Sequence, residues 1–168
     1  MQGRGTHRRS RLAPELNLRI RAATREDRAF IETLGKRTAM DSVSSLRHAD
    51  PSAVLANFDR LLAIVEQREH VALVAEIDGE RKGFMLSLDS LPDEVTGDDQ
   101  AFVVYMAVVR ESRRAGIASA LLERAEHEAR KRGAPYMALM VTEENVAAQA
   151  LYERAGYRTE RRLLCKTL

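Results

Sequence analysis

The stretch that most restricts the fold is an apolar run followed directly by a glycine-containing turn and an amphipathic segment. The run AFVVYMAVV covers residues 101–109, which suits a buried β-strand and is far shorter than the roughly 18 residues of a membrane span. The next segment, RESRRAGIASALLERA at residues 110–125, has the apolar spacing of a helix that covers one face of a sheet. Together they predict a strand, a tight turn and a helix.

The turn between these two elements has the chemistry of an anion site. A helix N-terminus presents unpaired N–H groups and about half a positive charge. Gly116 removes a side chain at this point, and Arg113 and Arg114 add formal charge. These features favour a pyrophosphate ligand. Since the turn matches neither G-x-G-x-x-G nor G-x-x-x-x-G-K-[ST], a nicotinamide cofactor and ATP are not expected.

The rest of the chain alternates between strand-like and helix-like patterns. Thr24 is a predicted helix N-cap, Asp50 followed by Pro51 predicts a second helix start, and Asp78-Gly79 predicts a hairpin turn. The expected strands are residues 16–23, a hairpin over 70–90, residues 101–109 and 136–141, and one or two short strands in 157–168. The expected helices are residues 25–40, 51–67, 117–132 and 142–155. This order predicts an α/β (α+β) fold, with a mixed sheet and helices on its faces.

Length and composition fit one globular domain. The chain has 168 residues, of which 45% are hydrophobic and 31% charged. Its net charge is +2, but residues 1–13 hold four arginines and no acid, so the remainder carries −2 and no nucleic-acid-binding face is expected. Residues 1–16 are expected to be a basic, disordered tail, with a transit peptide or an anion-binding arm as alternatives, before a single domain at 17–168.

The single cysteine and the four histidines give no sign of a metal or a nucleophile. Cys165 lies in the apolar run LLC and is expected to be a packed thiol. No cysteine or histidine cluster has metal-ligand spacing, so no metal is expected. A chain with one cysteine and no apolar segment of spanning length is expected to be cytoplasmic, without a membrane partner.

Two motifs in register resemble those of the GNAT superfamily of acetyl-CoA-dependent N-acetyltransferases. The first, Arg/Gln-x-x-Gly-x-Gly/Ala at the start of the third helix, reads here as Arg113, Arg114, Ala115, Gly116, Ile117 and Ala118. The second, Asn-x-x-Ala-x-x-Leu-Tyr-x-x-x-Gly-Phe/Tyr, reads here as Asn145, Ala148, Leu151, Tyr152, Gly156 and Tyr157. The resemblance covers residues 17–168.

This resemblance implies a fold and a co-substrate. The GNAT fold has a mixed, mostly antiparallel sheet of six to seven strands, flanked by about four helices, with a splayed pair of strands that holds CoA. Acetyl-CoA is the implied co-substrate, and no metal is implied. By the same resemblance, the pantetheine arm pairs with the exposed backbone of Met106, Ala107 and Val108. The N–H groups of residues 113–118 hold the pyrophosphate, and Asn145 contacts the cofactor arm near its reactive end.

The resemblance also implies a general acid, Tyr152, which protonates the departing thiolate. The glutamate that many members place on the strand before the turn is absent, because Val104 and Tyr105 stand there. Members that acetylate protein N-termini often have a glutamate in the next strand, where this chain has Met140. The remaining candidates for the base are Glu143, Glu144, Asp89 or a chain of water molecules, and none is assigned.

The expected activity is transfer of the acetyl group to a primary amine of a small molecule or a peptide. The alternatives are a non-catalytic acyl-CoA-binding module of the same fold, a protein N-terminal acetyltransferase, and an unrelated anion-binding domain. The segments at 40–52 and 89–100 are expected to form the walls of the acceptor site, the second through its acidic side chains. A homodimer is compatible with strands near the end of the chain.

Overall fold

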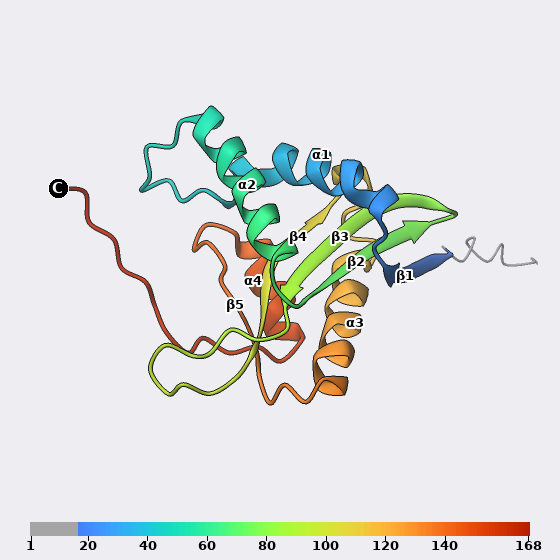
Figure 1. Ribbon diagram of the computed structural model, residues 1–168. Coiled ribbons are helices and arrows are strands. Elements are labelled where there is room, and N and C mark those ends of the chain that lie inside the picture. The colour runs from blue at the N-terminus through green and yellow to red at the C-terminus, as the bar shows by residue number, and fades with distance from the viewer. Residues whose placement is uncertain (1–16) are drawn as a thin grey trace, which may run out of the picture.

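Alternating apolar residues build a five-stranded sheet in the computed structural model, which describes residues 17–168 (Figure 1). The strands are β1 (Leu18–Ala22), β2 (His70–Ile77), β3 (Glu80–Leu88), β4 (Ala101–Val108) and β5 (Met137–Leu139). Their order in the sheet is their order in the sequence. The first three pairings are antiparallel and the β4–β5 pairing is parallel, so the expected mixed, mostly antiparallel sheet is confirmed.

Helices cover both faces of this sheet (Figure 1). They are α1 (Arg28–Ala39), α2 (Pro51–Glu66), α3 (Ile117–Lys131) and α4 (Val146–Arg154), with short 3₁₀ turns η1 (Arg25–Asp27), η2 (Met40–Ser42) and η3 (Arg110–Ser112). One core cluster joins α1 and α2 to the sheet, and a second joins α3 to the opposite face. Among residues 17–168, no helix is long and apolar enough to cross a membrane.

The expectation of six to seven strands and of a packed thiol at Cys165 is wrong for the part of the chain that the structure describes. Residues 158–168 form no strand and make no backbone hydrogen bond to the rest of residues 17–168. Cys165 is exposed with them, because no apolar surface covers this segment. The sheet therefore ends at β5, and its outer edge is open.

A fully buried carboxylate, that of Asp27, ties η1 to the sheet. It accepts hydrogen bonds from Arg21 Nη1 at 2.6 Å, from Arg81 Nε at 2.6 Å and from the backbone N–H of Thr24 at 2.7 Å. Arg21 also donates to Glu76 at 2.8 Å. The hydrogen bond from Arg21 holds the pKa of Asp27 far below its usual range, although burial opposes the shift. The charge is therefore kept in the interior by two arginines, Arg21 on β1 and Arg81 on β3.

Replacing Asp27 by asparagine should lower the free energy of unfolding by on the order of 3 kcal/mol at pH 7, because two arginines lose a buried counter-charge. The lowered pKa means that this stabilisation is present above the unfolded pKa of about 3.9 and is lost as the pH falls below it. The difference between the variant and the wild type should therefore shrink between about pH 5 and pH 2. Urea titrations at several pH values measure it.

The matched control for this prediction is Asp59→Asn, which removes a half-exposed carboxylate paired with Lys36 at 2.8 Å. An exposed pair contributes about 0–1 kcal/mol, so this variant should stay close to the wild type. Equal effects of the two substitutions would contradict the role assigned to Asp27.

Candidate active site

The candidate site begins where β4 parts from β5. The two strands pair only from Ala101 with Met137 to Val103 with Leu139. β4 nevertheless continues to Val108, where it still pairs with Gly83 of β3. Beyond Val103, the edge of β4 that faces β5 has no strand partner among the described residues. Met106, Ala107 and Val108 lie on this open stretch, so the expected splayed pair of strands is present.

A β-bulge at Val104 sets which way the side chains of β4 point. Val103 lies opposite Ser87 and Tyr105 lies opposite Leu86, so Val104 is the extra residue. After the bulge, Met106 and Val108 pack against the α3 cluster, and Ala107 is buried in the cluster beneath α1 and α2. The bulge thereby fixes the orientation of the open edge next to the turn before α3.

Tyr105 lies in the region where the glutamate is missing. Its side chain is packed against two aromatic rings and is hydrogen-bonded. Its ring stacks on Phe84 with centroids 5.8 Å apart and meets Phe58 edge-on at 5.0 Å. Its hydroxyl lies 3.0 Å from Thr38 Oγ1 and donates to the carbonyl of Gly35 at 3.2 Å. Burial raises the pKa of Tyr105. A phenol with these partners and a raised pKa is a poor general base.

The turn before α3 is built from two left-handed residues. Arg114 has φ of +67° and Gly116 has φ of +78°, and Gly116 is the N-cap of α3. A Cβ atom built at Gly116 would have no other atom within 4 Å. Glycine is therefore favoured here by the positive φ, and the space above it is open to a ligand.

The turn and the first residues of α3 present a row of free backbone N–H donors. The N–H of Arg113 donates to the carbonyl of Arg110 at 3.2 Å, whereas Ala120 makes the first helical bond of α3, to Gly116, at 3.0 Å. The N–H groups of residues 114–119 donate to no protein acceptor within residues 17–168. Ala115, Ile117 and Ala118, predicted to hold pyrophosphate, lie in this row, whereas the N–H of Arg113 is already used. Six consecutive donors at a helix N-terminus fit a diphosphate well.

The two arginine side chains of the turn differ in their surroundings. Arg113 Nη2 lies 3.2 Å from a carboxylate oxygen of Asp41, and its Nε donates to the carbonyl of Val108 at 3.5 Å. The charge of Arg113 is thus paired with that of Asp41, in the loop after α1. Arg114 is exposed and has no side-chain partner among the residues that the structure describes. Arg114 is therefore the cation of the turn that remains available to an anion.

Asn145 marks the opposite side of the gap between β4 and β5. It is the N-cap of α4, and its side-chain oxygen accepts from the N–H of Ala148 at 3.2 Å, so α4 begins four residues later than the sequence pattern suggested. The side-chain nitrogen of Asn145, Nδ2, has no hydrogen-bond partner within residues 17–168. Gln149 donates to the carbonyl of Glu143 at 2.7 Å and to that of Thr142 at 3.2 Å, which fixes the loop before Asn145.

Tyr152 packs on the same cluster as the open edge of β4. Met106, Val108 and Ala115 pack against that same cluster, and the ring of Tyr152 meets Tyr157 edge-on with centroids 5.9 Å apart. Burial raises the pKa of Tyr152, so the phenol is protonated at neutral pH. No side chain or backbone group of residues 17–168 forms a hydrogen bond with its hydroxyl. Tyr152 therefore lies on the same side of the sheet as the side chains of Met106 and Val108.

One of the two segments expected to form the walls of the acceptor site contacts the loop after β5. Residues 40–45 do border the gap: Ser45 Oγ donates to Glu144 Oε1 at 2.7 Å and Thr142 Oγ1 donates to the carbonyl of Ser42 at 2.8 Å. These bridges were not foreseen, since nothing local in the sequence signals a contact across 100 residues. The hydrogen bond from Ser45 lowers the pKa of Glu144, which makes this carboxylate a weaker base.

The acidic segment at 89–100 leads directly into β4, which parts from β5 after Val103. The segment stays a predicted wall of the acceptor site. Within it, Asp89 is paired with Arg132 at 3.2 Å, at the far end of α3.

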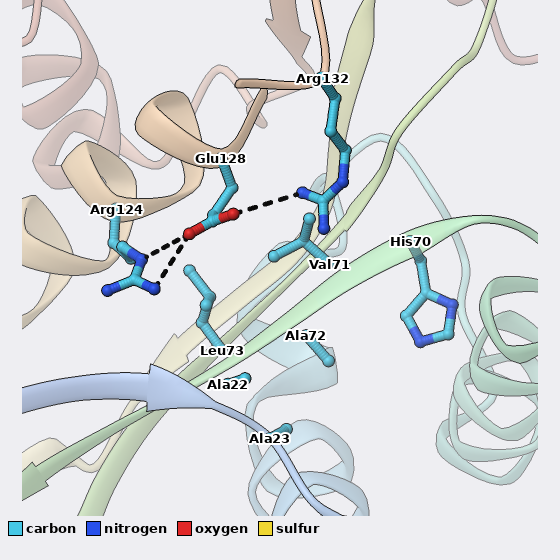
Figure 2. A pocket seen from close by; sticks show the side chains of 9 residues that line it. All are labelled: Ala22, Ala23, His70, Val71, Ala72, Leu73, Arg124, Glu128 and Arg132. Carbon is cyan, nitrogen blue, oxygen red and sulfur yellow. Dashed lines mark hydrogen bonds and ion pairs between the residues drawn. The ribbon is translucent and has the colours of Figure 1, made fainter. Parts of the chain in front are cut away.

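Two cavities of about 350 Å³ each lie beside α3, and one of them is also lined by Met137 of β5 and by Tyr157. The other opens between β1, β2 and α3, where Glu128 is held between Arg124 and Arg132 (Figure 2). Glu128 Oε1 lies 3.0 Å from Arg124 Nε. Since Asp89 also faces Arg132, the charges of this cavity balance. The candidate site is instead an open strand edge beside a helix N-terminus.

Comparisons with known proteins agree with this geometry. The sequence profile of the Acetyltransferase (GNAT) family matches residues 39–157, which include β4, the turn at Gly116 and α4. An acetyltransferase of Pectobacterium atrosepticum is 36% identical over 89 residues, which cover 52% of this chain and 57% of that protein. The chain thus matches little more than half the length of this curated relative.

Solved structures share the fold over nearly the whole chain. A Pyrococcus furiosus protein designated an acetyl transferase has 26% identity and a TM-score of 0.77, over 90% of this chain and 100% of its own. The aminoglycoside N-acetyltransferase AAC(6')-Iy, solved with a CoA-based bisubstrate analogue, has 21% identity and a TM-score of 0.67, over 90% and 98% of the two chains. A ribosomal-protein-alanine N-acetyltransferase of Brucella melitensis has 22% identity and a TM-score of 0.65, over 90% and 99%. Because the family profile covers most of the chain, and one of the two motifs follows each of the splayed strands, the chain belongs to the GNAT family of acetyltransferases.

Proposed function

We propose that the chain transfers the acetyl group of acetyl-CoA to a primary amine of a small molecule or a peptide. The observation that carries the proposal is the row of six free N–H groups at residues 114–119, next to the unpaired edge of β4. Solved neighbours with this fold contain CoA or a CoA-based analogue, which supports the same ligand here.

Different residues of the gap would bind different parts of acetyl-CoA. The N–H groups of residues 114–119 would hold the pyrophosphate, with Arg114 as the nearby free cation. The backbone of Met106, Ala107 and Val108 would pair with the pantetheine arm, as an added strand does. The side-chain nitrogen of Asn145, Nδ2, would donate a hydrogen bond to the pantetheine arm from the opposite side of the gap. Bound acetyl-CoA supplies an activated thioester to the amine.

Tyr152 would then act as the general acid. Attack of the amine on the thioester carbonyl forms a C–N bond and an oxyanion, and the C–S bond breaks when the oxyanion collapses. The phenol, kept protonated by burial, would give its proton to the departing thiolate. The ammonium proton goes to solvent or to a base. No residue is assigned as that base. Glu144 is less suited to that step, because its hydrogen bonds lower its pKa.

Two other functions compete with this proposal. A non-catalytic acyl-CoA-binding module is favoured by the absence of a glutamate at Val104, Tyr105 and Met140. A protein N-terminal acetyltransferase is favoured by one solved neighbour, which is named for that activity. Release of free thiol from acetyl-CoA, measured with a panel of small amines and peptides, separates the three. No release with any acceptor, despite CoA binding, would support the binding module.

Replacing Gly116 by valine should weaken CoA binding about tenfold or more, equivalent to at least about 1.4 kcal/mol. A β-branched residue is strained at φ of +78°, and its side chain would fill the open space where the pyrophosphate meets the N–H groups. Isothermal titration calorimetry with CoA measures the loss.

Gly133→Val is the matched control for this substitution. Gly133 follows the other end of α3, with φ of +84° and an equally open position. The control should lose a similar amount of stability but keep the wild-type affinity for CoA. Unchanged affinity in Gly116→Val, or an equal loss in Gly133→Val, would remove the pyrophosphate from this turn.

Replacing Tyr152 by phenylalanine should lower kcat by about 100- to 10,000-fold and leave CoA affinity unchanged. The substitution keeps the ring and its packing and removes only the hydroxyl. Steady-state acetylation of an acceptor found in the panel gives kcat, and calorimetry gives the affinity.

Tyr157→Phe is the control, because the ring of Tyr157 packs on the same cluster and its buried hydroxyl has no partner within the described residues. This control should keep the wild-type kcat. A Tyr152→Phe enzyme within about threefold of the wild type would exclude the phenol as the acid.

A further inference from the structure

The loop after α1 and the loop after β5 meet beside the gap between β4 and β5. Ser45 donates to Glu144 through its backbone N–H at 3.0 Å and through its hydroxyl at 2.7 Å. The hydroxyl of Ser44 lies 3.2 Å from the same carboxylate oxygen. Residues 40–46 and 140–146 therefore form one continuous surface, called here the paired loops.

The paired loops expose five large apolar side chains, called here the apolar patch. Met40 and Leu46 lie on one loop. Met140 and Val146, which are 82% and 70% exposed, lie with Val141 on the other loop. Each of the five is within two residues of a hydrogen bond that joins the loops, so they gather where the loops meet. An exposed apolar patch beside a binding gap marks a surface that contacts a ligand.

Most of the charged groups of the paired loops are already engaged within the protein. Asp41 is paired with Arg113 at 3.2 Å, and Glu144 accepts three hydrogen bonds from the other loop. Glu143 is exposed, and its carboxylate has no side-chain partner among residues 17–168. The groups that the paired loops leave free for a ligand are therefore one carboxylate and the apolar patch.

We propose that the acetyl acceptor is a primary amine with one positive charge and an apolar chain or ring, which the paired loops bind. This inference rests on the proposed function, because it names the class of amine that is acetylated. The apolar part would cover the apolar patch, and Glu143 would attract the ammonium form. A polyhydroxylated amine would gain less, because its hydroxyl groups would lose water against apolar side chains.

The same chemistry occurs in an alkylamine and in a peptide whose first residue is apolar, so the first test includes both. It compares kcat/KM for ethylamine, butylamine and hexylamine, which are equally basic and differ in apolar length. The value should rise about two- to fourfold with each added methylene that becomes buried. Leu-Gly-Gly against Gly-Gly-Gly makes the same comparison for peptides, and the better series identifies the source. Values that rise in neither series, or a higher value for the polyhydroxylated kanamycin than for every apolar acceptor, would overturn the proposal.

The second test is the double substitution Met40→Gln/Met140→Gln, which keeps the length of both side chains and makes them polar. It should lower kcat/KM for hexylamine about tenfold and that for ethylamine less than about threefold, because only the longer amine covers the apolar patch. Ile64→Gln is the control, since Ile64 is a half-exposed apolar residue on α2, and it should leave both values unchanged. Equal losses for the two amines in the double variant, or no loss, would overturn the proposal.

A binding measurement separates this inference from the proposed chemistry. The full chain, labelled with ¹³C-methyl methionine and saturated with CoA, is titrated with hexylamine and with Leu-Gly-Gly. The methyl resonances of Met40 and Met140 should shift, and that of Met85, which is fully buried, should not. Shifts without acetyl transfer would contradict the proposed function and support the amine site. Absence of these shifts would overturn the amine site, whether or not acetyl transfer occurs.

Discussion

The separation of β4 from β5 after Val103 is the constraint on which the candidate site depends. Two parallel strands that share only three residue pairs leave the rest of the longer strand with one free edge. That edge lies immediately before the turn at Gly116, where the helix N-terminus adds its own free N–H groups. A ligand with an extended amide arm and a diphosphate is therefore matched by two adjacent sets of backbone donors and acceptors, without any need for a deep cavity.

A third segment, the loop between α1 and α2, contacts both flanks of the gap. On one side, Asp41 pairs with Arg113 of the turn at 3.2 Å. On the other side, Ser45 donates to Glu144 at 2.7 Å, in the loop between β5 and Asn145. The two flanks of the gap are thereby connected through residues 41–45. Beneath this loop, the aromatic packing of Tyr105 fixes β4 against α1 and α2.

Local features of the site could be predicted from the sequence, because they depend on neighbouring residues. Apolar periodicity located β4 and α3, and the turn chemistry located Gly116, whose positive φ the structure explains. The capping motif identified Thr24 and Asp27 as a helix start. It did not reveal that Asp27 is buried against Arg81, because a contact across 54 residues leaves no local pattern.

Arrangements that depend on the whole topology were predicted less well. The acidic segment at 89–100 was expected at the acceptor site because of its charge, and the structure shows that it leads into β4 and binds Arg161 through Asp93. The alternating residues near Leu163 were expected to form a strand of the same sheet. The structure leaves them exposed, and Arg161 just before them forms an ion pair with Asp93. Charge and hydropathy indicate whether a segment favours water or a buried environment. Its position in the fold depends on the order of the strands.

The most direct test of the central claim is a ¹H–¹⁵N NMR titration of the full chain with CoA and, separately, with pantetheine. The amide resonances of residues 114–119 should shift on addition of CoA, because its pyrophosphate accepts their hydrogen bonds. Pantetheine lacks the pyrophosphate, so it should shift the resonances of residues 106–108 but leave those of 114–119 nearly unchanged. Resonances of 114–119 that do not respond to saturating CoA would contradict the account.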